Sequence, residues 1–188
     1  MDDSDAAIRA VAVGAALEEL RQWGVDRFSI EGVVQRCDLD AELVGRFWPS
    51  PHDLIAEALL SSASATIRTP DTGSLARDLD ELADSMRTYL NDPDGRRIAR
   101  MLVIDSKSHT VDQESRRLIW RRHLDMVTTI LDRASARGEV RPGVEPVSVM
   151  ELLSGPLKSC ALYSNEPIAP DYCRSIADMV TRAVSADR

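Results

Sequence analysis

The chain has 188 residues, of which 44% are hydrophobic, 29% are charged and only 4% are aromatic. This length allows one domain or two small ones with a substantial buried core, and the abundance of Ala, Leu, Arg, Asp and Glu favours helices over strands. The formal net charge is −8 at pH 7. No apolar run approaches the roughly 20 residues that cross a bilayer. The composition therefore excludes a membrane-spanning protein and weighs against tight nonspecific binding to nucleic acid.

The charge is unevenly distributed along the chain. Residues 1–60 carry five basic and twelve acidic groups, a net charge of −7, whereas residues 93–141 carry eleven basic and seven acidic groups, a net charge of +4. Cys37, Cys160 and Cys173 are odd in number and show no paired spacing, which predicts reduced thiols in a cytoplasmic protein. The acidic N-terminal residues do not resemble a signal peptide.

The first third of the chain predicts three helices separated by short turns. A helix is expected to begin near Ser4 and to end at Gly24, a residue typical of helix C-termini. Ser29 then caps a second helix, residues 37–39 form a tight turn, and Asp40 caps a third helix.

A fourth helix is predicted after a clear stop signal. Trp48-Pro49 ends the third helix, because the residue before a proline resists the α conformation. Ser50, Pro51 and Asp53 then supply the cap, the first helical residue and the capping-box acid of the fourth helix. Two short helices around a tight turn, followed by another helix, form the layout of a helix-turn-helix DNA-binding unit. We therefore predict a DNA-binding domain over residues 4–64.

The rest of the chain predicts a second helical domain over residues 74–186. Turn formers between Thr66 and Ser74 mark the boundary. Five further helices are expected over residues 74–90, around 98–104, over 111–137, over 147–163 with an interruption at Gly155-Pro156, and around 176–184. The whole chain is thus predicted to be all-α, with about nine helices and no convincing strand.

At these residues the chain resembles the TetR family of transcriptional repressors. Ser29-Ile30-Glu31 matches the start of that family's second helix, and Phe47-Trp48-Pro49-Ser50 matches its aromatic-aromatic-Pro-Ser junction. Segments 136–142, 152–157 and 166–168 are similar to one branch of the family. The resemblance implies a homodimer whose third helices enter the major groove, and a small-molecule ligand in the C-terminal domain that changes the spacing of the two reading heads.

The resemblance also implies where DNA is contacted. The residues concerned are Ser29, Ala41, Glu42, Gly45, Arg46, Phe47 and His52. Base edges require hydrogen-bond donors and acceptors, and phosphates require cations. Among the reading positions only Glu42 and Arg46 are long and polar, so Arg46 suits guanine or phosphate and Glu42 suits cytosine. The alternatives are a solvated Arg46 and a Glu42 that only favours the helix dipole.

The chain departs from the family pattern at several of the expected contacts. Asp38 replaces the glycine usual at the turn, Ala41 replaces the usual Lys or Arg, and Pro51 replaces the Lys that often opens the fourth helix. The first interpretation remains a repressor that a small, largely apolar ligand releases from its double-stranded DNA operator. The second is a ligand- or protein-binding module on the same fold, with weak or lost DNA binding.

Two further sets of residues are predicted in the C-terminal domain. Met, Leu and aromatic residues at helical spacing form either the wall of a ligand pocket or plain core, namely Met86, Tyr89, Met101, Trp120, His123, Leu124, Leu153 and Leu157. An apolar stripe on the last two long helices suits a four-helix dimer interface, formed by Met150, Leu153, Leu157, Ala161, Ile176, Met179 and Val180.

Neither an enzyme nor a cofactor is expected. The acidic cluster over residues 78–84 is interpreted as an exposed helix face rather than a catalytic pair of carboxylates. The histidines and cysteines lack metal-ligand spacing, there is no glycine-rich phosphate loop, and Ser154-Gly155-Pro156 lacks the first glycine of a nucleophile elbow. The basic run 116–123 is interpreted as a solvated face, because at helical spacing its charges spread around the helix.

Overall fold

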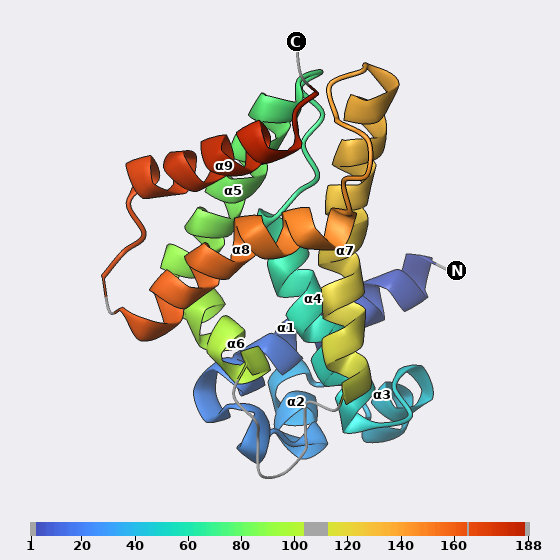
Figure 1. The fold of residues 1–188 in the computed structure, drawn as a ribbon. Helices are drawn as coiled ribbons and strands as arrows, with labels where there is room; N and C mark the ends of the chain where they lie inside the picture. Colours follow the sequence, from blue (N-terminus) through green and yellow to red (C-terminus); the bar gives the residue numbers. More distant parts are fainter. Residues whose placement is uncertain (1–2, 104–112, 165, 187–188) are drawn as a thin grey trace. The chain divides into compact units, whose positions relative to one another are not determined.

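The computed structural model describes residues 3–103, 113–164 and 166–186 of the chain. Within these ranges there are nine α-helices and no β-strand, and the one extended contact is an isolated bridge between Val140 and Ser185 (Figure 1). This confirms the all-α prediction. None of the helices in these ranges combines the length and the apolar composition that a membrane span requires.

The chain forms two compact units. The first consists of the residues up to Ala63 together with the end of α6 and the start of α7, and the second consists of the remainder. The helices before the boundary are α1 (Asp3–Trp23), α2 (Ile30–Cys37), α3 (Ala41–Phe47) and α4 (Pro51–Thr66), with a 3-10 turn, η1 (Val25–Arg27). The helices after it are α5 (Leu75–Asn91), α6 (Pro93–Val103), α7 (Gln113–Ala136), α8 (Pro146–Tyr163) and α9 (Pro170–Val184).

The helix starts in the first unit follow the capping residues in the sequence. Asp40 Oδ1 accepts a hydrogen bond from the backbone N–H of Glu42 at 2.7 Å and so caps α3. Ser50 and Asp53 form a reciprocal capping box at α4, in which Ser50 Oγ accepts from the Asp53 N–H at 3.3 Å and Asp53 Oδ2 accepts from the Ser50 N–H at 3.2 Å. Both predicted starts are confirmed.

The turn between α2 and α3 is closed by Asp38. Its φ of 53° lies in the left-handed region, and it is the one non-glycine with positive φ in the described part of the chain. Its N–H donates to the Val34 carbonyl at 3.0 Å and so ends α2. Aspartate tolerates this conformation better than most residues because its side chain is short and polar. The turn therefore has a left-handed geometry in which glycine is the most easily accommodated residue.

The centre of the second unit is formed by α5, α8 and α9, which pack against one another in pairs. Their facing sides are fully buried, with Leu79 and Leu82 from α5 and Leu153 and Leu157 from α8. The side-chain amide of Asn91 joins the end of α5 to the segment before α9, because it accepts from the Ile168 N–H at 2.8 Å and donates to the Ile168 carbonyl at 3.0 Å.

One predicted helix interruption and one predicted helix start are wrong. α8 runs unbroken through Gly155-Pro156, although Pro156 has no N–H to donate to the Leu152 carbonyl. Burial of Leu153 and Leu157 on either side outweighs that loss, which is on the order of 3 kcal/mol. α6 likewise begins at Pro93, several residues earlier than predicted, because Asp92 Oδ1 accepts from two N–H groups of its first turn at 3.0 Å.

Asp78 is buried at the start of α5, whereas the sequence predicts an exposed acidic face there. Its Oδ1 accepts from both the N–H and the Oγ1 of Thr72 at 2.7 Å, and its Oδ2 lies 3.8 Å from the Arg137 guanidinium. Glu139 Oε2 accepts from the Leu75 N–H at 2.6 Å. These two carboxylates tie the loop before α5 and the first turn of α5 to the segment that follows α7.

We expect Asp78→Ala to lower the free energy of unfolding by about 2–4 kcal/mol, because the half-buried donors of Thr72 lose their buried acceptor. The matched control is Glu81→Ala, which removes an exposed carboxylate from the same helix. It should change the free energy of unfolding by about 0.5 kcal/mol or less. Urea denaturation of both variants measures the difference, and equal effects would contradict the structural role of Asp78.

Candidate nucleic-acid interface

The helix-turn-helix is fastened to α1 by the buried carboxylate of Glu19, which is 3% exposed. Its Oε2 accepts from Arg36 Nε at 2.8 Å, and its Oε1 accepts from Ser29 Oγ at 3.4 Å, so it holds both ends of α2. Gly32 lies between these contacts, and a Cβ at this position would overlap Glu19 Oε1. A side chain at position 32 would therefore displace the Glu19 carboxylate from this place.

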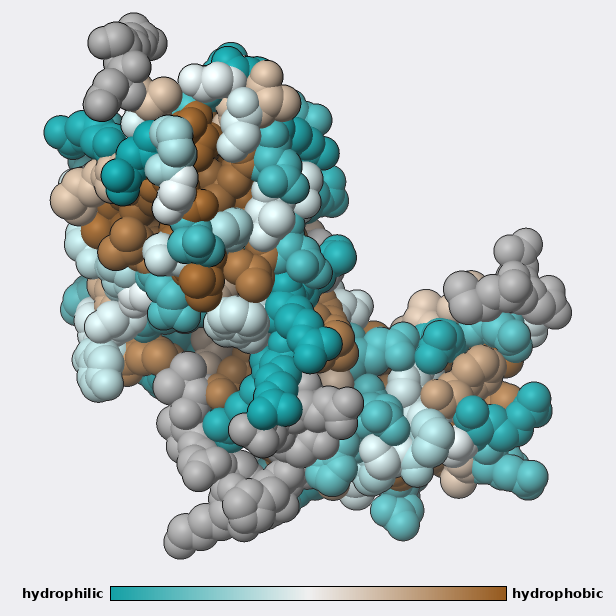
Figure 2. All heavy atoms as spheres, turned by 45° about the vertical axis from the view of Figure 1, so that its right-hand side comes forward, coloured by the Kyte–Doolittle hydropathy of each residue, from teal (hydrophilic) through white to brown (hydrophobic). Residues whose placement is uncertain are grey.

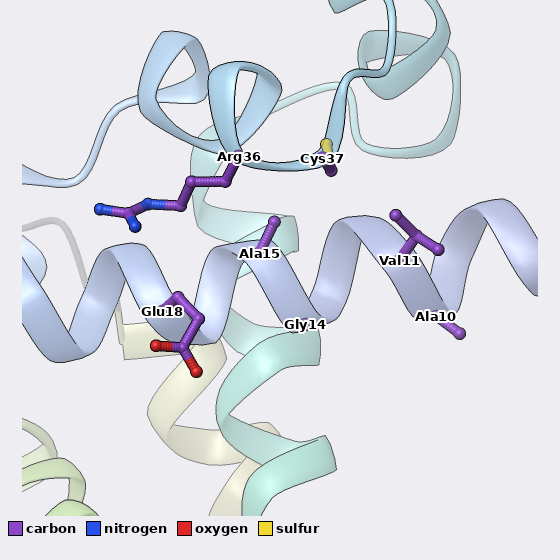
Figure 3. A pocket seen from close by; sticks show the side chains of 7 residues that line it. All are labelled: Ala10, Val11, Gly14, Ala15, Glu18, Arg36 and Cys37. Atoms are coloured by element: carbon purple, nitrogen blue, oxygen red, sulfur yellow. The ribbon is translucent and has the colours of Figure 1, made fainter.

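The same pair of helices leaves a shallow groove of about 440 Å³ on its outer side (Figure 3). Its lining residues are Ala10, Val11, Gly14, Ala15, Glu18, Arg36 and Cys37. Arg36 extends from α2 along α1, whereas Glu18 is turned to the opposite side of α1 (Figure 3). The one cation among the lining residues, Arg36, is already held by Glu19 and Gln22. The groove therefore offers no free positive charge to a ligand.

Phe47 and Trp48 hold the C-terminal end of α3. Trp48 is buried, and its Nε1 donates to Glu57 Oε2 at 2.7 Å. The guanidinium of Arg9 lies over both rings, 5.6 Å from the centroid of Phe47 and 5.4 Å from that of Trp48, and 3.5 Å from Glu57 Oε2. These contacts connect α3 to α1 and α4 and so fix the direction in which α3 projects.

The outer face of α3 is short and mostly uncharged. Val44 faces the core, and Ala41, Glu42, Gly45 and Arg46 are exposed. Positions 41 and 45, like 42 and 46, lie one helical turn apart, so the four residues share one side of the helix. Arg46 makes no ion pair with any residue that the structure describes. Its guanidinium is therefore available to a base edge or a phosphate.

The other three predicted contact residues lie in different surroundings. Ser29 Oγ accepts from the Gly32 N–H at 3.0 Å, so Ser29 caps α2 as predicted, and it also contacts Glu19. Phe47 is half-buried beneath Arg9. His52 is half-buried in the first turn of α4, where backbone N–H groups lack helical partners. Ser29 and Phe47 thus serve the scaffold, whereas the face of α3 is free.

The surface around α3 is acidic. Asp38 and Asp40 at its start and Asp53 in the first turn of α4 are all exposed. Arg27 in η1 is exposed and, like Arg46, has no ion pair within the described ranges. Sequence reasoning missed Arg27, which carries no helical pattern, and missed Glu19, because a buried acid on a helix looks like a surface residue in the sequence.

The predicted pocket residues divide between core and surface. Met86, Tyr89, Leu153 and Leu157 are buried, His123 and Leu124 are half-buried, Trp120 is 41% exposed, and the side chain of Met101 in α6 lies outside the described residues. Burial and, to a smaller extent, the positive charge of Lys158 together lower the pKa of His123 to about 4. The imidazole is therefore neutral at pH 7. Burial also lowers the pKa of Lys158.

The predicted dimer interface is corrected by the burial of its residues. Six of the seven are buried inside the chain, namely Met150, Leu153, Leu157, Ala161, Ile176 and Val180, and only Met179 is exposed, by 51%. The prediction chose the inner faces of α8 and α9, because periodicity finds an apolar stripe without showing what covers it.

The outer sides of α8 and α9 are apolar as well. Leu152 and Tyr163 of α8 are exposed, and so are Tyr172 and Met179 of α9. Leu152 and Tyr163 are eleven residues apart and Tyr172 and Met179 are seven apart, so each pair lies on one side of its helix. Figure 2 shows hydrophobic surface gathered on the second unit, whereas the visible surface of the first unit is mostly hydrophilic.

Known proteins resemble this chain in sequence and in fold. Residues 69–180, more than half of the chain, match the family model of the tetracyclin repressor-like C-terminal domain. The chain is 29% identical over 150 residues to the HTH-type transcriptional regulator AqdR of Rhodococcus erythropolis, which covers 80% of this chain and 72% of AqdR. It is 20% identical over 174 residues to the uncharacterized HTH-type transcriptional regulator YdeS of Bacillus subtilis, with coverage of 93% and 88%. The TetR regulator TylP of Streptomyces fradiae superposes with a TM-score of 0.72 at 19% identity, over 98% of this chain and 89% of that one.

We expect Gly32→Ala to lower the free energy of unfolding by about 1–3 kcal/mol, because Glu19 must give up Ser29 and Arg36 to make room. Gly45→Ala in the neighbouring helix is the matched control, since its Cβ would meet nothing within 4 Å. It should raise the free energy of unfolding by up to about 1 kcal/mol, because alanine favours helix. Chemical denaturation of both variants measures the effects, and the same sign for both would rule out the close approach at position 32.

Proposed function

Because the chain belongs to the TetR family of transcriptional regulators, we propose that it is a homodimeric repressor that binds an operator with α3 of each copy. The observation that carries the proposal is Arg46, which lies on the exposed face of α3 and forms no ion pair with the residues that the structure describes. Glu19 holds α2, and the Phe47–Trp48 junction holds the far end of α3. A short helix that is anchored behind and open in front suits insertion into the major groove.

The side chains on α3 suggest how the operator is read. Arg46 can donate two hydrogen bonds to the O6 and N7 of guanine, and Glu42 can accept one from the N4 of cytosine. Ala41 and Gly45 are short, so the helix backbone can approach the bases closely. The exposed Asp38 and Asp40 repel phosphates, so binding draws little on backbone charge and depends more on the bases.

Dimerisation would use the outer sides of α8 and α9. Leu152, Tyr163, Tyr172 and Met179 leave apolar surface exposed on two helices that pack against each other, and Tyr163 is 89% exposed. Two copies of such a face form a four-helix interface that removes this surface from water. A dimer also supplies a second α3, which is needed to contact two operator half-sites that lie roughly 34–36 Å apart.

The second unit would bind the small-molecule ligand. The family model covers the part of the chain to which the half-buried His123 and Leu124 and the exposed Trp120 belong. Some dimers have a spacing between their two helix-turn-helix units that does not fit the operator. A ligand that binds these dimers more tightly lowers the fraction of protein that can bind DNA. Repression is then relieved when the ligand is present.

A second function is favoured by the acidic surface around α3. With Asp38, Asp40 and Asp53 exposed and only Arg27 and Arg46 unpaired among the described residues of the helix-turn-helix, the unit has little general attraction for DNA. Under this alternative the chain is a ligand- or protein-binding module with weak or lost DNA binding. The next experiment separates the two functions.

We expect the protein to retard DNA that flanks its own gene in a low-salt gel-shift assay. Arg46→Ala should weaken binding about tenfold or more, the loss of a bidentate base contact worth 1–3 kcal/mol. The control is Arg68→Ala, which removes an exposed arginine outside the helix-turn-helix and should leave affinity unchanged. Absence of retardation at low salt would favour the binding module over the repressor.

We expect the protein to be a dimer in solution and the double substitution Leu152→Arg, Met179→Arg to convert it to a monomer, because four arginines would face one another in the interface. Sedimentation or light scattering at micromolar concentration measures the mass. Arg174→Glu is the control, since position 174 is five residues from Met179 and so about 140° around α9. A wild-type monomer, or a dimer that survives the double substitution, would contradict the proposed interface.

A further inference from the structure

The arginines among residues 3–63 divide into two groups. This part of the chain contains five arginines and no lysine. Three of the arginines are held by acids of the scaffold, in the pairs Arg9–Glu57, Arg21–Glu18 and Arg36–Glu19. The other two, Arg27 and Arg46, are exposed and form no ion pair with the residues that the structure describes. The scaffold thus uses three of the five and α3 carries a fourth, which leaves Arg27 without a role in either.

Arg27 is carried by a short turn that is fixed to the scaffold. It is the last residue of η1, and Val25 at the start of this turn is buried. The Phe28 N–H donates to the Val25 carbonyl at 3.2 Å, and Ser29, the next residue, caps α2. Since η1 also packs against α1, the backbone at Arg27 has a defined position beside the start of α2, from which the exposed side chain extends into solvent.

The first helix of a helix-turn-helix meets the sugar-phosphate backbone of DNA. In such a unit the second helix lies in the major groove and the first helix crosses the backbone. Here these helices are α3 and α2. Contacts to phosphate fix the register and orientation of a protein on the duplex, whereas contacts to base edges specify the sequence. Arg27 beside the first helix and Arg46 on the second therefore suit these two different tasks.

The charges around Arg27 confine its attraction for DNA to one point. Asp26 precedes it and Glu31 lies in the first turn of α2, and both carboxylates are exposed. Asp38 and Asp40 are exposed at the other end of α2. Since like charges repel, this surface has little general attraction for the DNA backbone. A phosphate is held only where the guanidinium reaches it with charge-assisted hydrogen bonds.

We propose that Arg27 of each copy binds one phosphate of the operator and so sets α3 in register with the bases that Arg46 reads. This rests on the proposed function, to which it adds a contact residue and a defined dependence on salt. A dimer then neutralises two phosphates through its two copies of Arg27, and four charges are neutralised if Arg46 displaces counterions as well.

The dependence on salt follows from the number of charges neutralised. The slope of log K against log salt concentration is about −0.9 for each neutralised phosphate, so two to four of them give a slope of about −1.8 to −3.6. Raising the salt from 50 to 200 mM then weakens binding by a factor of about 10 to 150, whereas a protein with 6–10 phosphate contacts loses about 10³–10⁵. Operator binding is therefore expected to tolerate salt better than binding through a basic surface does.

The test measures affinity and its salt slope by fluorescence anisotropy, on the duplex that the gel-shift assay identifies and on variants of it with single base-pair changes. Arg27→Ala should weaken binding about tenfold at 50 mM salt, by the same factor for every duplex, and should reduce the slope by about 1.8. Arg46→Ala should weaken binding to the operator and leave binding to one of the changed duplexes unaffected, because the base contact is already lost there.

Lysine substitutions separate a phosphate contact from a base contact. Arg27→Lys should keep the slope and most of the affinity, because an ammonium group can neutralise a phosphate as a point charge. Arg46→Lys should lose much of the preference for the operator, because the two hydrogen bonds of a guanidinium fork are not reproduced by an ammonium group. Arg68→Ala removes an equal charge outside the helix-turn-helix and should change neither affinity nor slope. Equal melting temperatures of the wild type and Arg27→Ala exclude a loss of folding.

The outcomes separate this inference from the proposed function. Operator binding whose affinity and slope are unchanged in Arg27→Ala overturns the phosphate contact and leaves the proposed function intact. A loss in Arg27→Ala that differs from one duplex to another would make Arg27 a base contact, with the same consequence. A wild-type slope steeper than about −4 would show that further cations bind phosphates and would also contradict the inference. Absence of retardation at low salt would remove the proposed function and the phosphate contact together.

Discussion

The helix-turn-helix depends on one buried carboxylate. Glu19 reaches from α1 to the cap of α2 at Ser29 and to the last turn of α2 at Arg36. Because Gly32 has no side chain, α2 lies against this carboxylate instead of being held away from it. Burying a charge is costly unless hydrogen bonds surround it, and here they come from the element that must be positioned. The interaction that anchors α2 therefore also sets where the turn and α3 begin.

The scaffold behind α3 is well anchored, whereas the exposed side of α3 carries few groups that can bind DNA. Behind the helix, Trp48, Glu57 and Arg9 are joined by a hydrogen bond, an ion pair and two cation–π contacts. In front of it, Arg46 is the one exposed cation of the helix, and Asp38 and Asp40 precede it. Contacts that hold α3 in one direction are useful only if that direction matters for function. The arrangement fits a protein that reads few bases and gains little from phosphate charge.

Local features of the fold were predictable from the sequence, and features that depend on distant packing were not. The caps at Asp40, Ser50 and Asp53 act within three residues, so the sequence shows them directly. Asp78 and Glu19 look like ordinary surface acids in the sequence, because their partners are separated from them or lie on another helix. α8 is apolar on both its inner and its outer side, so periodicity alone could not tell core from interface.

The candidate DNA surface was predictable for a similar reason. The positions of Ala41, Glu42, Gly45 and Arg46 follow from the turn and from helical spacing. Ser29 and Phe47 could not be assigned from spacing, since only tertiary contacts show that their side chains hold the scaffold.

Pro156 has a consequence at the surface of α8. A proline inside a helix leaves the carbonyl four residues earlier without its usual N–H, and here that carbonyl belongs to the exposed Leu152. The Leu152 carbonyl therefore lacks its usual helical donor beside an exposed leucine side chain. Any surface that covers Leu152 must therefore supply a hydroxyl, an amide or a trapped water as a hydrogen-bond donor to that oxygen, because apolar contact alone would leave the oxygen unsatisfied.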